Sequence, residues 1–420
     1  MRLRAGAIAA GGACVARAPD GRVTFVRHAL PGELVRASVT GESRRFLRAD
    51  AVEVLEPSPD RVPAPCAFAG PGRCGGCDFQ HMALPAQRAA KAGLLRAQLQ
   101  HHTGLDVPVT VEVPMVHGRI DDDGLGWRTR MQFAVDTSGR AGLRRHRSHE
   151  VEPIDDCRIA APPVAARELL ATRWPGAGAV VVACADGGPD PGTGDDAGAG
   201  AGAAGAGATR SVVALPHGRT SGAPQPGIGS TATLTAHVLG RRFRISPGSF
   251  WQVHQGAPQV LAEAVVTGLQ PMAGENVLDL YAGVGLFAAV IGVMVGPSGT
   301  VTAVESSRGA AADARYNLRG LARSTVLRSS VAPGVLRRVG PADLVVLDPP
   351  RAGAGRAVTA AIAALRPRRV AYVACDPATL GRDLGVLVEL GWQIRSLRAF
   401  DLFPMTEHVE AVAICEPPGS

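Results

Sequence analysis

Apolar and polar residues alternate in short runs at the start of the chain. The runs RVTFVRHAL, ELVRASVTGES and FLRADAVEVLEP lie within residues 1–58 and are separated by Gly and Pro. Such alternation is typical of strands with one buried face. Because an isolated pair of hairpins is not stable in water, the pattern predicts a small five-stranded β-barrel of the OB type over residues 1–58.

The middle of the chain, residues 59–250, is expected to be a mixed α+β domain. A helical run extends from Pro85 to about His102, and we expect this helix to pack on the C-terminal domain. Strand-like pieces follow, namely MQFAVD, AVVVACA, RSVVALP and RFRISPGSF. Residues 187–209 are rich in Gly and Ala and have too few large apolar side chains to pack, so we expect a disordered surface loop there.

Over residues 251–420, apolar strand-like runs alternate with Ala- and Leu-rich helical runs. The strand-like runs are ENVLDLYAG, GTVTAVESS, ADLVVLDPP, RRVAYVAC and QIRSLRAFDLF. This alternation predicts a Rossmann-like α/β domain built on a parallel, doubly wound sheet. In such domains ligands bind beyond the carboxyl ends of the strands, so the residues that follow the strands are the candidates for chemistry.

Length and composition are those of a globular protein. The 420 residues allow two or three domains, and a hydrophobic fraction of 46% can fill their cores. No apolar run approaches the roughly 20 residues of a membrane-spanning helix. The basic N-terminus contains only a short, Gly-rich apolar stretch that leads directly into strand-like sequence, so we reject a signal peptide. We expect a cytoplasmic monomer without membrane contact.

The basic residues are concentrated in the first third of the chain. The net charge is +7, and residues 1–150 contain 21 Arg and Lys against 15 Asp and Glu, a surplus of six. A GC-rich genome would explain why Lys91 is the only lysine, but not where the surplus lies. The runs Arg128–Arg130 and Arg144–Arg147 suit phosphate contacts, although a solvated basic face is equally compatible with any single arginine. The distribution favours a polyanionic partner.

Two strand ends predict a pocket for an adenosine-containing cofactor. The strand NVLDLY ends in a loop with Gly283 and Gly285, which allow a sharp turn and a close approach of the backbone to a ligand. About 20 residues later, Glu305 ends the next strand, where an acidic side chain typically binds ribose hydroxyls. This spacing leaves NAD and S-adenosylmethionine as alternatives.

Three further residues stand at the ends of apolar strands in the same domain. Asp348 follows ADLVVL, Cys375 follows RRVAYVA, and Glu410 precedes AVAIC. A cysteine after an apolar strand is usually a small buried hydrophobic residue. Because this one is expected to share a sheet edge with Asp348 and the glycine loop, it is also a candidate nucleophile.

A cluster of cysteines lies in the middle domain. Cys66, Cys74 and Cys77 occupy a Gly- and Pro-rich loop, and Cys157 is a distant fourth thiol. In a cytosolic protein such clusters indicate metal binding or catalysis more often than disulfides. Four thiols can bind zinc or a [4Fe–4S] cluster, and the spacing alone leaves both open.

Together these motifs resemble a known family over most of the chain. DLYAGVG, LDPPRAG, CDPATLGRD and FPMTEHVE occur in this order, and CGGCDFQH precedes them. They resemble the bacterial RNA 5-methyluridine methyltransferases, in the branch with an N-terminal TRAM barrel and an iron–sulfur cluster. The resemblance implies a class I methyltransferase domain that uses S-adenosylmethionine and a [4Fe–4S] cluster with a structural role.

The resemblance also implies roles for individual residues. Cys375 would add to C6 of uracil, and Glu410 would remove the C5 proton after methyl transfer. The side chains that would contact the cofactor are those of Gln252, Tyr281, Glu305 and Asp348. The ligands of the [4Fe–4S] cluster would be Cys66, Cys74, Cys77 and Cys157.

Two positions depart from the family's pattern. Asp376 and His254 stand where the family usually has Asn. A carboxylate that pointed at Cys375 would disfavour its thiolate by like-charge repulsion, so we expect Asp376 to face the backbone or an arginine. Beside the base, Glu407 and His408 are expected to orient a loop.

The expected substrate is a uridine in folded RNA, which must leave its stack before a nucleophile can reach C6. We expect ribosomal RNA of the large subunit, 23S rRNA, with transfer RNA as the alternative. A non-catalytic RNA-binding protein with a methyltransferase fold, or a methyltransferase of small molecules, would be the competing interpretations. The intact Cys375 and Glu410 argue against the first, and the barrel with its basic surroundings argues against the second.

Overall fold

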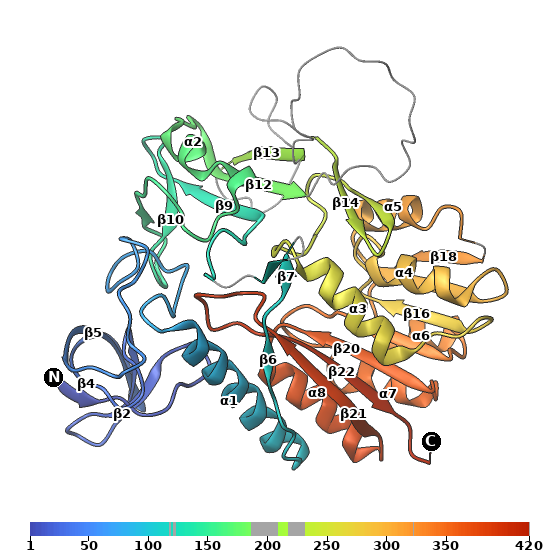
Figure 1. Cartoon of the computed structure of the whole chain (residues 1–420), viewed down its shortest axis with the longest axis horizontal. Helices are drawn as coiled ribbons and strands as arrows, with labels where there is room; N and C mark the ends of the chain where they lie inside the picture. The colour runs from blue at the N-terminus through green and yellow to red at the C-terminus, as the bar shows by residue number, and fades with distance from the viewer. Residues whose placement is uncertain (117–118, 121–122, 186–208, 217–231, 322, 420) are drawn as a thin grey trace.

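The structure is a computed structural model that describes all residues except 117–118, 121–122, 186–208, 217–231, 322 and 420. Figure 1 shows the N-terminal strands as a small barrel, a central part above it, and the C-terminal residues in a large layered α/β unit. The loop predicted over 187–209 lies outside the described residues except for Thr209, at which β13 begins. The proposed domain boundaries after residues 58 and 250 stay predictions.

The N-terminal barrel consists of five strands in the order β1-β4-β5-β3-β2. They are β1 (Arg2–Arg4), β2 (Cys14–Arg17), β3 (Val23–Arg27), β4 (Leu34–Glu42) and β5 (Phe46–Glu56). Alternate residues point inward, so that Leu3, Val26 and Val35 fill the barrel core. The alternation in the sequence therefore predicted these strands correctly.

The central part contains an antiparallel sheet in the order β11-β10-β9-β12-β13. Its strands are β9 (Arg130–Val135), β10 (Ala141–Arg144), β11 (Val151–Glu152), β12 (Ala177–Ala185) and β13 (Thr209–Pro216). The smaller elements around it are η1 (Pro162–Val164), α2 (Ala166–Ala171) and the two-stranded pairs β7 (Met115–Val116) with β8 (Arg119–Ile120) and β14 (Leu234–Val238) with β15 (Arg241–Ile245).

The largest sheet in the described residues has the order β18-β17-β16-β19-β20-β22-β21-β6. Its strands are β6 (Val111–Glu112), β16 (Asn276–Leu280), β17 (Thr300–Glu305), β18 (Ser324–Arg328), β19 (Leu344–Leu347), β20 (Arg369–Ala374), β21 (Gln393–Phe400) and β22 (Glu410–Glu416). The prediction of a parallel sheet was wrong for one strand, because β22 lies antiparallel between β20 and β21. As a result, β22 begins at the edge where β20 ends.

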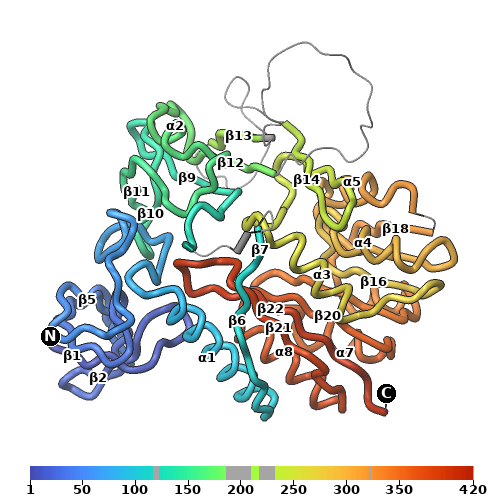
Figure 2. The backbone as a smooth tube through the Cα atoms, in the orientation of Figure 1, coloured from blue at the N-terminus to red at the C-terminus, as the bar shows by residue number. Residues whose placement is uncertain are grey.

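Helices cover both faces of this sheet, as the tube in Figure 2 also shows. The helices are α1 (Leu84–Thr103), α3 (Ala257–Leu269), α4 (Leu286–Val295), α5 (Arg308–Asn317), α6 (Pro333–Val339), α7 (Arg356–Ala364) and α8 (Pro377–Glu389). Buried residues of α3 and α4 pack on one face, and those of α1, α6, α7 and α8 pack on the other. Such two-sided cover is what a mainly parallel sheet requires.

Helix α1 packs directly on α8, which ties the middle of the chain to the large sheet. The close approach depends on two glycines of α8. A Cβ atom on Gly381 would lie 2.8 Å from the carbonyl oxygen of Gln98, and one on Gly385 would lie 2.7 Å from that of His102. Glycine is therefore required at both positions for the two helix backbones to meet.

The only lysine of the chain anchors α1 to the loop before β22. The Lys91 side chain is fully buried, and its Nζ donates to Asp401 Oδ1 at 2.6 Å and to the carbonyl oxygen of Phe403 at 2.9 Å. One turn earlier, Gln87 accepts a hydrogen bond from the Met405 backbone N–H at 2.9 Å. Helix α1 thereby holds the loop 401–409, at whose end Glu410 begins β22.

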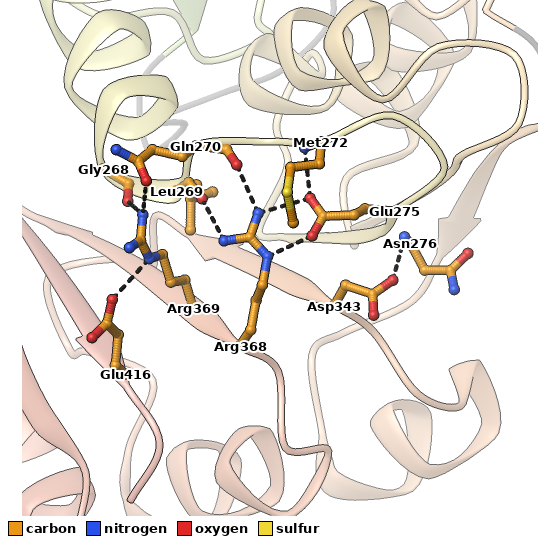
Figure 3. Close-up of polar contacts among 10 residues, drawn as sticks. All are labelled: Gly268, Leu269, Gln270, Met272, Glu275, Asn276, Asp343, Arg368, Arg369 and Glu416. Carbon is orange, nitrogen blue, oxygen red and sulfur yellow. Dashed lines mark hydrogen bonds and ion pairs between the residues drawn. The ribbon is translucent and has the colours of Figure 1, made fainter. Parts of the chain in front are cut away.

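A second set of contacts fixes the opposite edge of the sheet (Figure 3). At the start of β20, Arg368 donates to Glu275 Oε2 at 2.8 Å and to the carbonyl oxygens of Leu269 and Gln270. Arg369 donates to Glu416 Oε1 at 2.9 Å and to the Gly268 carbonyl at 2.9 Å. Two guanidinium groups therefore satisfy the last carbonyls of α3, as cations at a helix C-terminus typically do.

We searched the described residues for a helix both long enough and apolar enough to span a bilayer, and found none.

The buried ion pair gives a testable prediction. Replacing Lys91 by Met leaves the Asp401 carboxylate buried without its partner, so we expect the free energy of unfolding to fall by about 3–5 kcal/mol. Urea unfolding followed by circular dichroism measures this change. The control is Arg96→Gln on the same helix, which removes an exposed ion pair with Asp106 beyond the helix end and should change stability little. Equal effects of the two substitutions would contradict the role given to Lys91.

Candidate active site

The predicted site residues meet at the carboxyl edge of the large sheet. Tyr281 follows β16, Glu305 ends β17, Asp348 follows β19 and Cys375 follows β20. All four strands are parallel to their neighbours in this group, so their carboxyl ends lie along one edge. The sequence therefore placed these residues on the correct edge.

Cys375 and Glu410 become neighbours through the antiparallel strand. Ala374 at the end of β20 pairs with Ala411 of β22. In antiparallel pairing, the residue after the first partner lies beside the residue before the second, and these are Cys375 and Glu410. The Cys375 side chain is half-buried, whereas Glu410 is only 3% exposed.

Burial and neighbouring carboxyl groups dominate the electrostatics at this point. Burial, and secondarily the charge of Glu410, raises the pKa of the Cys375 thiol to about 12, while Arg351 acts in the opposite direction. Burial also raises the pKa of Glu410 well above its usual range, and Asp348 adds to the effect. The pKa of Asp348 is raised to about 7 by burial. The Asp348 carboxyl group is thus poised to exchange protons near neutral pH, and the Glu410 carboxyl group holds its proton more tightly than an exposed one does.

The sequence analysis assigned no role to Arg351, the last residue of the DPPR segment. Its Nη2 lies 3.0 Å from His408 Nε2, and its charge favours the ionised forms of both Cys375 and Glu410. Burial, followed by Arg351, lowers the pKa of His408 to about 4, so this imidazole is neutral at physiological pH. The sequence shows an arginine shortly after the acid at a strand end. This pattern does not indicate which side chains the arginine contacts.

The loop around the Arg351 segment is held by a carboxylate of α8. Asp383 Oδ2 accepts hydrogen bonds from the backbone N–H of Ala354 at 2.7 Å and from the Tyr372 hydroxyl at 2.6 Å. Asp383 is fully buried, so these bonds fix the loop rigidly against the helix. This contact was also missed in the sequence.

The expected orientation of Asp376 is confirmed. Asp376 is the N-cap of α8, and its Oδ1 accepts a hydrogen bond from the Thr379 backbone N–H at 2.8 Å. An aspartate cap followed by Pro377 is a strong start signal for a helix. The carboxylate is therefore used in capping, although its charge still disfavours the Cys375 thiolate to a minor extent.

The glycine loop turns sharply between β16 and α4. Gly283 and Gly285 have φ values of 54° and 85°, and Tyr281 also adopts a left-handed backbone with φ of 59°. The Gly283 N–H donates to Glu305 Oε2 at 2.9 Å, which joins the loop to the end of β17. Glu305 Oε1 accepts from the Ser307 N–H at 2.6 Å. Oε2 accepts only the Gly283 hydrogen bond among the described residues, so it retains a lone pair for another donor, such as a ribose hydroxyl.

Gln252 and Asp348 lie together on the other side of this loop. Gln252 Nε2 donates to Asp348 Oδ2 at 3.3 Å, although the two residues are 96 positions apart. Close by in the sequence, His254 is buried, stacks on Trp127 and accepts a hydrogen bond from the Gly256 N–H at Nδ1. His254 thus packs in the interior. The sequence, in which it stands where the family usually has Asn, did not indicate this role.

A further buried acid was not singled out from the sequence. Asp279 in β16 is fully buried, and its Oδ2 accepts from the Ala288 N–H at 2.8 Å. Its Oδ1 has no hydrogen-bond partner among the described residues. Burial raises the pKa of Asp279 to about 8, with smaller contributions from Asp348 and Glu305. An unpaired buried oxygen of this kind can form a hydrogen bond with a ligand.

The four predicted metal ligands surround one cavity in the central part. Cys66, Cys74, Cys77 and Cys157 line a space of about 410 Å³. The Gln80 side chain bridges two of them, since its Nε2 donates to Cys77 Sγ at 3.3 Å and its Oε1 accepts from the Cys66 N–H at 3.1 Å. Across the described residues, no group of three or more His, Cys, Asp or Glu side chains converges tightly enough to hold a metal ion. The cluster ligands therefore stay a prediction.

Comparison with known protein families finds matches to three separate parts of the chain. A family described as tRNA (Uracil-5-)-methyltransferase matches residues 341–416, and a TRAM domain matches residues 7–52. A third family, described as protein-L-isoaspartate(D-aspartate) O-methyltransferase, matches residues 251–336.

Similar proteins extend the match over nearly the whole chain. An uncharacterized RNA methyltransferase of Streptomyces coelicolor is 47% identical and covers 99% of this chain and 92% of its own length. A protein of Halomonas elongata named 23S rRNA (uracil(1939)-C(5))-methyltransferase is 32% identical, with coverages of 97% and 87%.

A solved structure supports the fold. The tRNA (uracil-54, C5)-methyltransferase of Pyrococcus abyssi, in complex with S-adenosyl-L-homocysteine, superposes with a TM-score of 0.66 at 22% identity and covers 98% of this chain and 99% of its own. The predicted Rossmann-like class I methyltransferase fold with an N-terminal TRAM barrel is confirmed. The chain belongs to the family of RNA uracil-C5 methyltransferases.

Proposed function

We propose that this chain transfers a methyl group from S-adenosylmethionine to C5 of a uridine in RNA, with Cys375 as nucleophile and Glu410 as base. The observation that carries the proposal is the pairing of Ala374 with Ala411, which sets the thiol beside the carboxyl group at the sheet edge. A pyrimidine needs both groups near one edge of its ring, since C5 and C6 are adjacent atoms.

The residues along the strand ends suit the cofactor. When bound, S-adenosylmethionine supplies a methyl group on a positively charged sulfonium. Glu305 offers carboxylate oxygens beside Gly283 for ribose hydroxyls. Gln252 and Asp348 form a hydrogen-bonded pair near the carboxyl group of Glu410, and the ionised form of Asp348 suits a cation. Tyr281 and Gly285 complete the turn over which the cofactor would lie.

The proposed reaction starts with the addition of Cys375. The Sγ electron pair forms a bond to C6, and the electrons of the C5–C6 double bond move to C5 and O4 as an enolate. C5 then forms a bond to the methyl group, whose bond to the donor sulfur breaks and leaves its electron pair on that sulfur. Glu410 removes the C5 proton, the electron pair restores the C5–C6 double bond, and the Cys375 thiolate leaves.

Arg351 is proposed to favour the reactive form of the nucleophile. The free thiol is mostly protonated, because burial and Glu410 raise its pKa to about 12. The Arg351 charge opposes this rise, and the same guanidinium lowers the pKa of Glu410. A base is most effective when its pKa lies near the working pH, so the raised pKa of Glu410 suits proton removal from C5.

The cysteine cavity is proposed to hold a [4Fe–4S] cluster with a structural role. The support is the cavity of about 410 Å³ that Cys66, Cys74, Cys77 and Cys157 line together, since a single zinc ion with sulfur ligands at about 2.3 Å needs less space. In a cluster each thiolate binds a different iron atom, so the thiols can stand further apart around a larger space. The amide of Gln80 that donates to Cys77 Sγ is the kind of hydrogen bond that cluster sulfurs accept.

The proposed substrate is 23S rRNA, modified in the cytoplasm. The relative from Halomonas elongata named for that RNA is 32% identical, whereas the solved structure named for transfer RNA is 22% identical. Transfer RNA is the second candidate because the solved structure matches this chain over its whole length.

The nucleophile can be tested with RNA that contains 5-fluorouridine. Fluorine cannot be removed as a cation, so the covalent adduct persists, and we expect wild-type protein to shift on denaturing gels. Cys375→Ala should abolish the adduct, whereas Cys415→Ala, which changes a buried thiol of β22, should retain it. An adduct with Cys375→Ala would remove this residue from the mechanism, and its absence in the wild type would favour a non-catalytic RNA-binding protein.

The base can be tested on unmodified RNA. Glu410→Gln cannot accept the C5 proton, so we expect the methylated adduct to accumulate and turnover to fall by about 10²–10⁴-fold. Tritium release from 5-tritiated uridine measures the proton removal. Glu407→Gln, three residues earlier, is the control and should release tritium. Normal release by Glu410→Gln would assign the base to another residue.

The substrate can be tested by mass mapping of RNA from a strain that lacks the gene. We expect one 5-methyluridine to disappear from 23S rRNA and to return when the wild-type gene, but not the Cys375→Ala gene, is supplied. Loss of the modification from transfer RNA instead would establish the second candidate.

A further inference from the structure

Arg351 lies in a tight turn of the segment that follows β19. The Gly353 N–H donates to the Pro350 carbonyl oxygen at 2.7 Å, which makes Arg351 the second residue of a β-turn. The Arg351 side chain is exposed, and its Nη2 lies 3.0 Å from the neutral imidazole of His408. Because one neutral ring is a weak anchor for a long exposed side chain, the position of the Arg351 charge depends on where the backbone of the turn is held.

Two consecutive residues of α8 hold this turn. Asp383 Oδ2 accepts hydrogen bonds from the backbone N–H of Ala354 at 2.7 Å and of Gly355 at 3.1 Å. Arg382 Nη2 donates to the Ala352 carbonyl oxygen at 2.8 Å. The two side chains also bind each other, since Arg382 Nε donates to Asp383 Oδ1 at 3.0 Å. The Arg382–Asp383 pair thus binds backbone donors and a backbone acceptor of the turn and of the residues that follow it.

The turn can reach this pair because Gly353 has no side chain. Its φ is 76°, in the left-handed region that favours glycine. A Cβ atom there would lie 2.5 Å from Arg382 Nη2 and 2.6 Å from Asp383 Oδ2. It would also lie 3.2 Å from Cβ of Thr379, about one turn earlier in α8. The backbone of the turn is therefore in direct contact with one face of the helix.

The hydroxyl of Tyr372 joins the Arg382–Asp383 pair to the strand that carries the nucleophile. It donates to Asp383 Oδ2 at 2.6 Å and accepts from the Ala354 N–H at 3.1 Å. Tyr372 is fully buried in β20, three residues before Cys375. Burial and the hydrogen bond to Asp383 raise the pKa of Tyr372, so its hydroxyl stays protonated and continues to donate at physiological pH.

Helix α8 also carries the nucleophile at its start. Cys375 directly precedes Asp376, the N-cap of α8, whose carboxylate accepts from the Thr379 N–H. Asp383 follows the cap by seven residues, which is about two helical turns, so both lie on one face of the helix. Because a helix has a fixed rise and twist, the thiol before α8 and the turn held by Asp383 keep a fixed relation to each other.

The position of Arg351 matters because acidic groups surround the thiol. Burial raises the pKa of the Cys375 thiol, and three carboxyl groups raise it further through their charges. These belong to Glu410 of β22, Asp348 after β19 and Asp376 at the start of α8. Arg351 opposes them and lowers the pKa. If its turn moved away from α8, the thiol would lose this opposing charge and its thiolate fraction would fall.

We propose that Arg382 and Asp383 are positioning residues for the nucleophile, because they hold the turn of Arg351 on α8 and so keep its positive charge beside Cys375. Both act through Arg351 and not by touching the substrate. The inference rests on the proposed function, in which Cys375 attacks the uridine, and it adds two residues on which the reactivity of the thiol depends.

The test compares how two alkylating reagents of similar size react with Cys375 in the full-length protein. Iodoacetamide is neutral and iodoacetate is an anion, and both react with the thiolate. Mass spectrometry of the peptide that contains Cys375 separates its rate from those of the other cysteines. The ratio of the iodoacetate rate to the iodoacetamide rate reports positive charge beside the sulfur, because changes in access or in thiolate fraction affect both rates alike.

Two substitutions weaken the hold on the turn. Asp383→Asn keeps the side-chain volume but replaces one carboxylate oxygen by a donor, so it cannot accept from the turn, from Tyr372 and from Arg382 at once. Arg382→Ala removes the hydrogen bond to the Ala352 carbonyl. We expect each substitution to lower the ratio by about threefold, the effect in water of one unit charge several ångströms away, and to slow the reaction with iodoacetamide because less thiolate is present.

Arg351→Gln is the reference variant and should lower the ratio as much. The matched control is Arg356→Ala, which removes another arginine that binds α8, in an exposed ion pair with Glu389, and it should keep the wild-type ratio. In the Arg351→Gln background, neither Arg382→Ala nor Asp383→Asn should lower the ratio further, because the charge that they position is gone.

A wild-type ratio for Arg382→Ala would overturn the positioning role. An undiminished effect of Arg382→Ala in the Arg351→Gln background would overturn it too, because the charge of Arg382 itself would then act on the thiol. The Arg382 side chain is 45% exposed, so this variant should fold even if Asp383→Asn, which alters a buried carboxylate, does not.

The adduct with 5-fluorouridine RNA separates failure of this inference from failure of the proposed function. If the wild type forms no adduct, the proposed function is wrong, whatever the alkylation ratios are. If the wild type forms the adduct, and Arg382→Ala and Asp383→Asn change neither its rate of formation nor the alkylation ratio, the positioning role is wrong but the mechanism stands. Slower adduct formation together with a lower ratio in both variants would support the inference.

Discussion

The ion pair between Lys91 and Asp401 joins two segments that are 310 positions apart, and it does so where water is excluded. In such surroundings neither charge can remain without the other, so α1 and the loop 401–409 must be placed together. That loop ends at Glu410, and the strand that starts there pairs with the strand that ends before Cys375. The distance between the proposed nucleophile and base thus depends on a contact of α1, an element outside the α/β unit in sequence. The close packing of α1 on Gly381 and Gly385 serves the same end, because it fixes the helix that carries the lysine.

Much of this arrangement could be predicted from local sequence signals. The helix expected over 85–102 is observed as α1 (Leu84–Thr103), because Pro85 at its start and Gly104 after its end mark both boundaries. The positions of Glu305, Asp348 and Cys375 followed from the rule that parallel strands end at one edge. The direction and place of β22 could not be predicted, since an apolar run such as AVAIC is compatible with either orientation. The contacts of Lys91 and Arg351 could not be predicted either, because their partners lie in distant segments and no local sequence pattern marks these pairs.

Burial at the sheet edge has opposite consequences for the two proposed catalytic groups. It raises the pKa of Glu410 and so makes this carboxylate a stronger base, but it also raises the pKa of Cys375 and reduces the thiolate fraction. The negative charge of Glu410 raises the pKa of Cys375 further. Arg351 lowers the pKa of both groups, so it increases the thiolate fraction of Cys375 and limits the rise in the pKa of Glu410. The carboxylate of Asp376 would raise the pKa of Cys375 more strongly if it faced the thiol. Because it caps α8, it points to the backbone instead.

The cysteine loop also connects segments that are far apart in the sequence. Methyl transfer from a sulfonium requires no electron transfer, so a cluster at Cys66, Cys74, Cys77 and Cys157 needs no redox role to be retained. The loop contacts the β10–β11 turn at Gly75, and the residue after Cys77, Asp78, donates its N–H to the Met405 carbonyl in the loop before Glu410. One short segment therefore touches both the β10–β11 turn and the loop of the proposed base. A shift in the cysteine loop would displace both, so a cluster with a structural role would affect the active site as well as the central sheet.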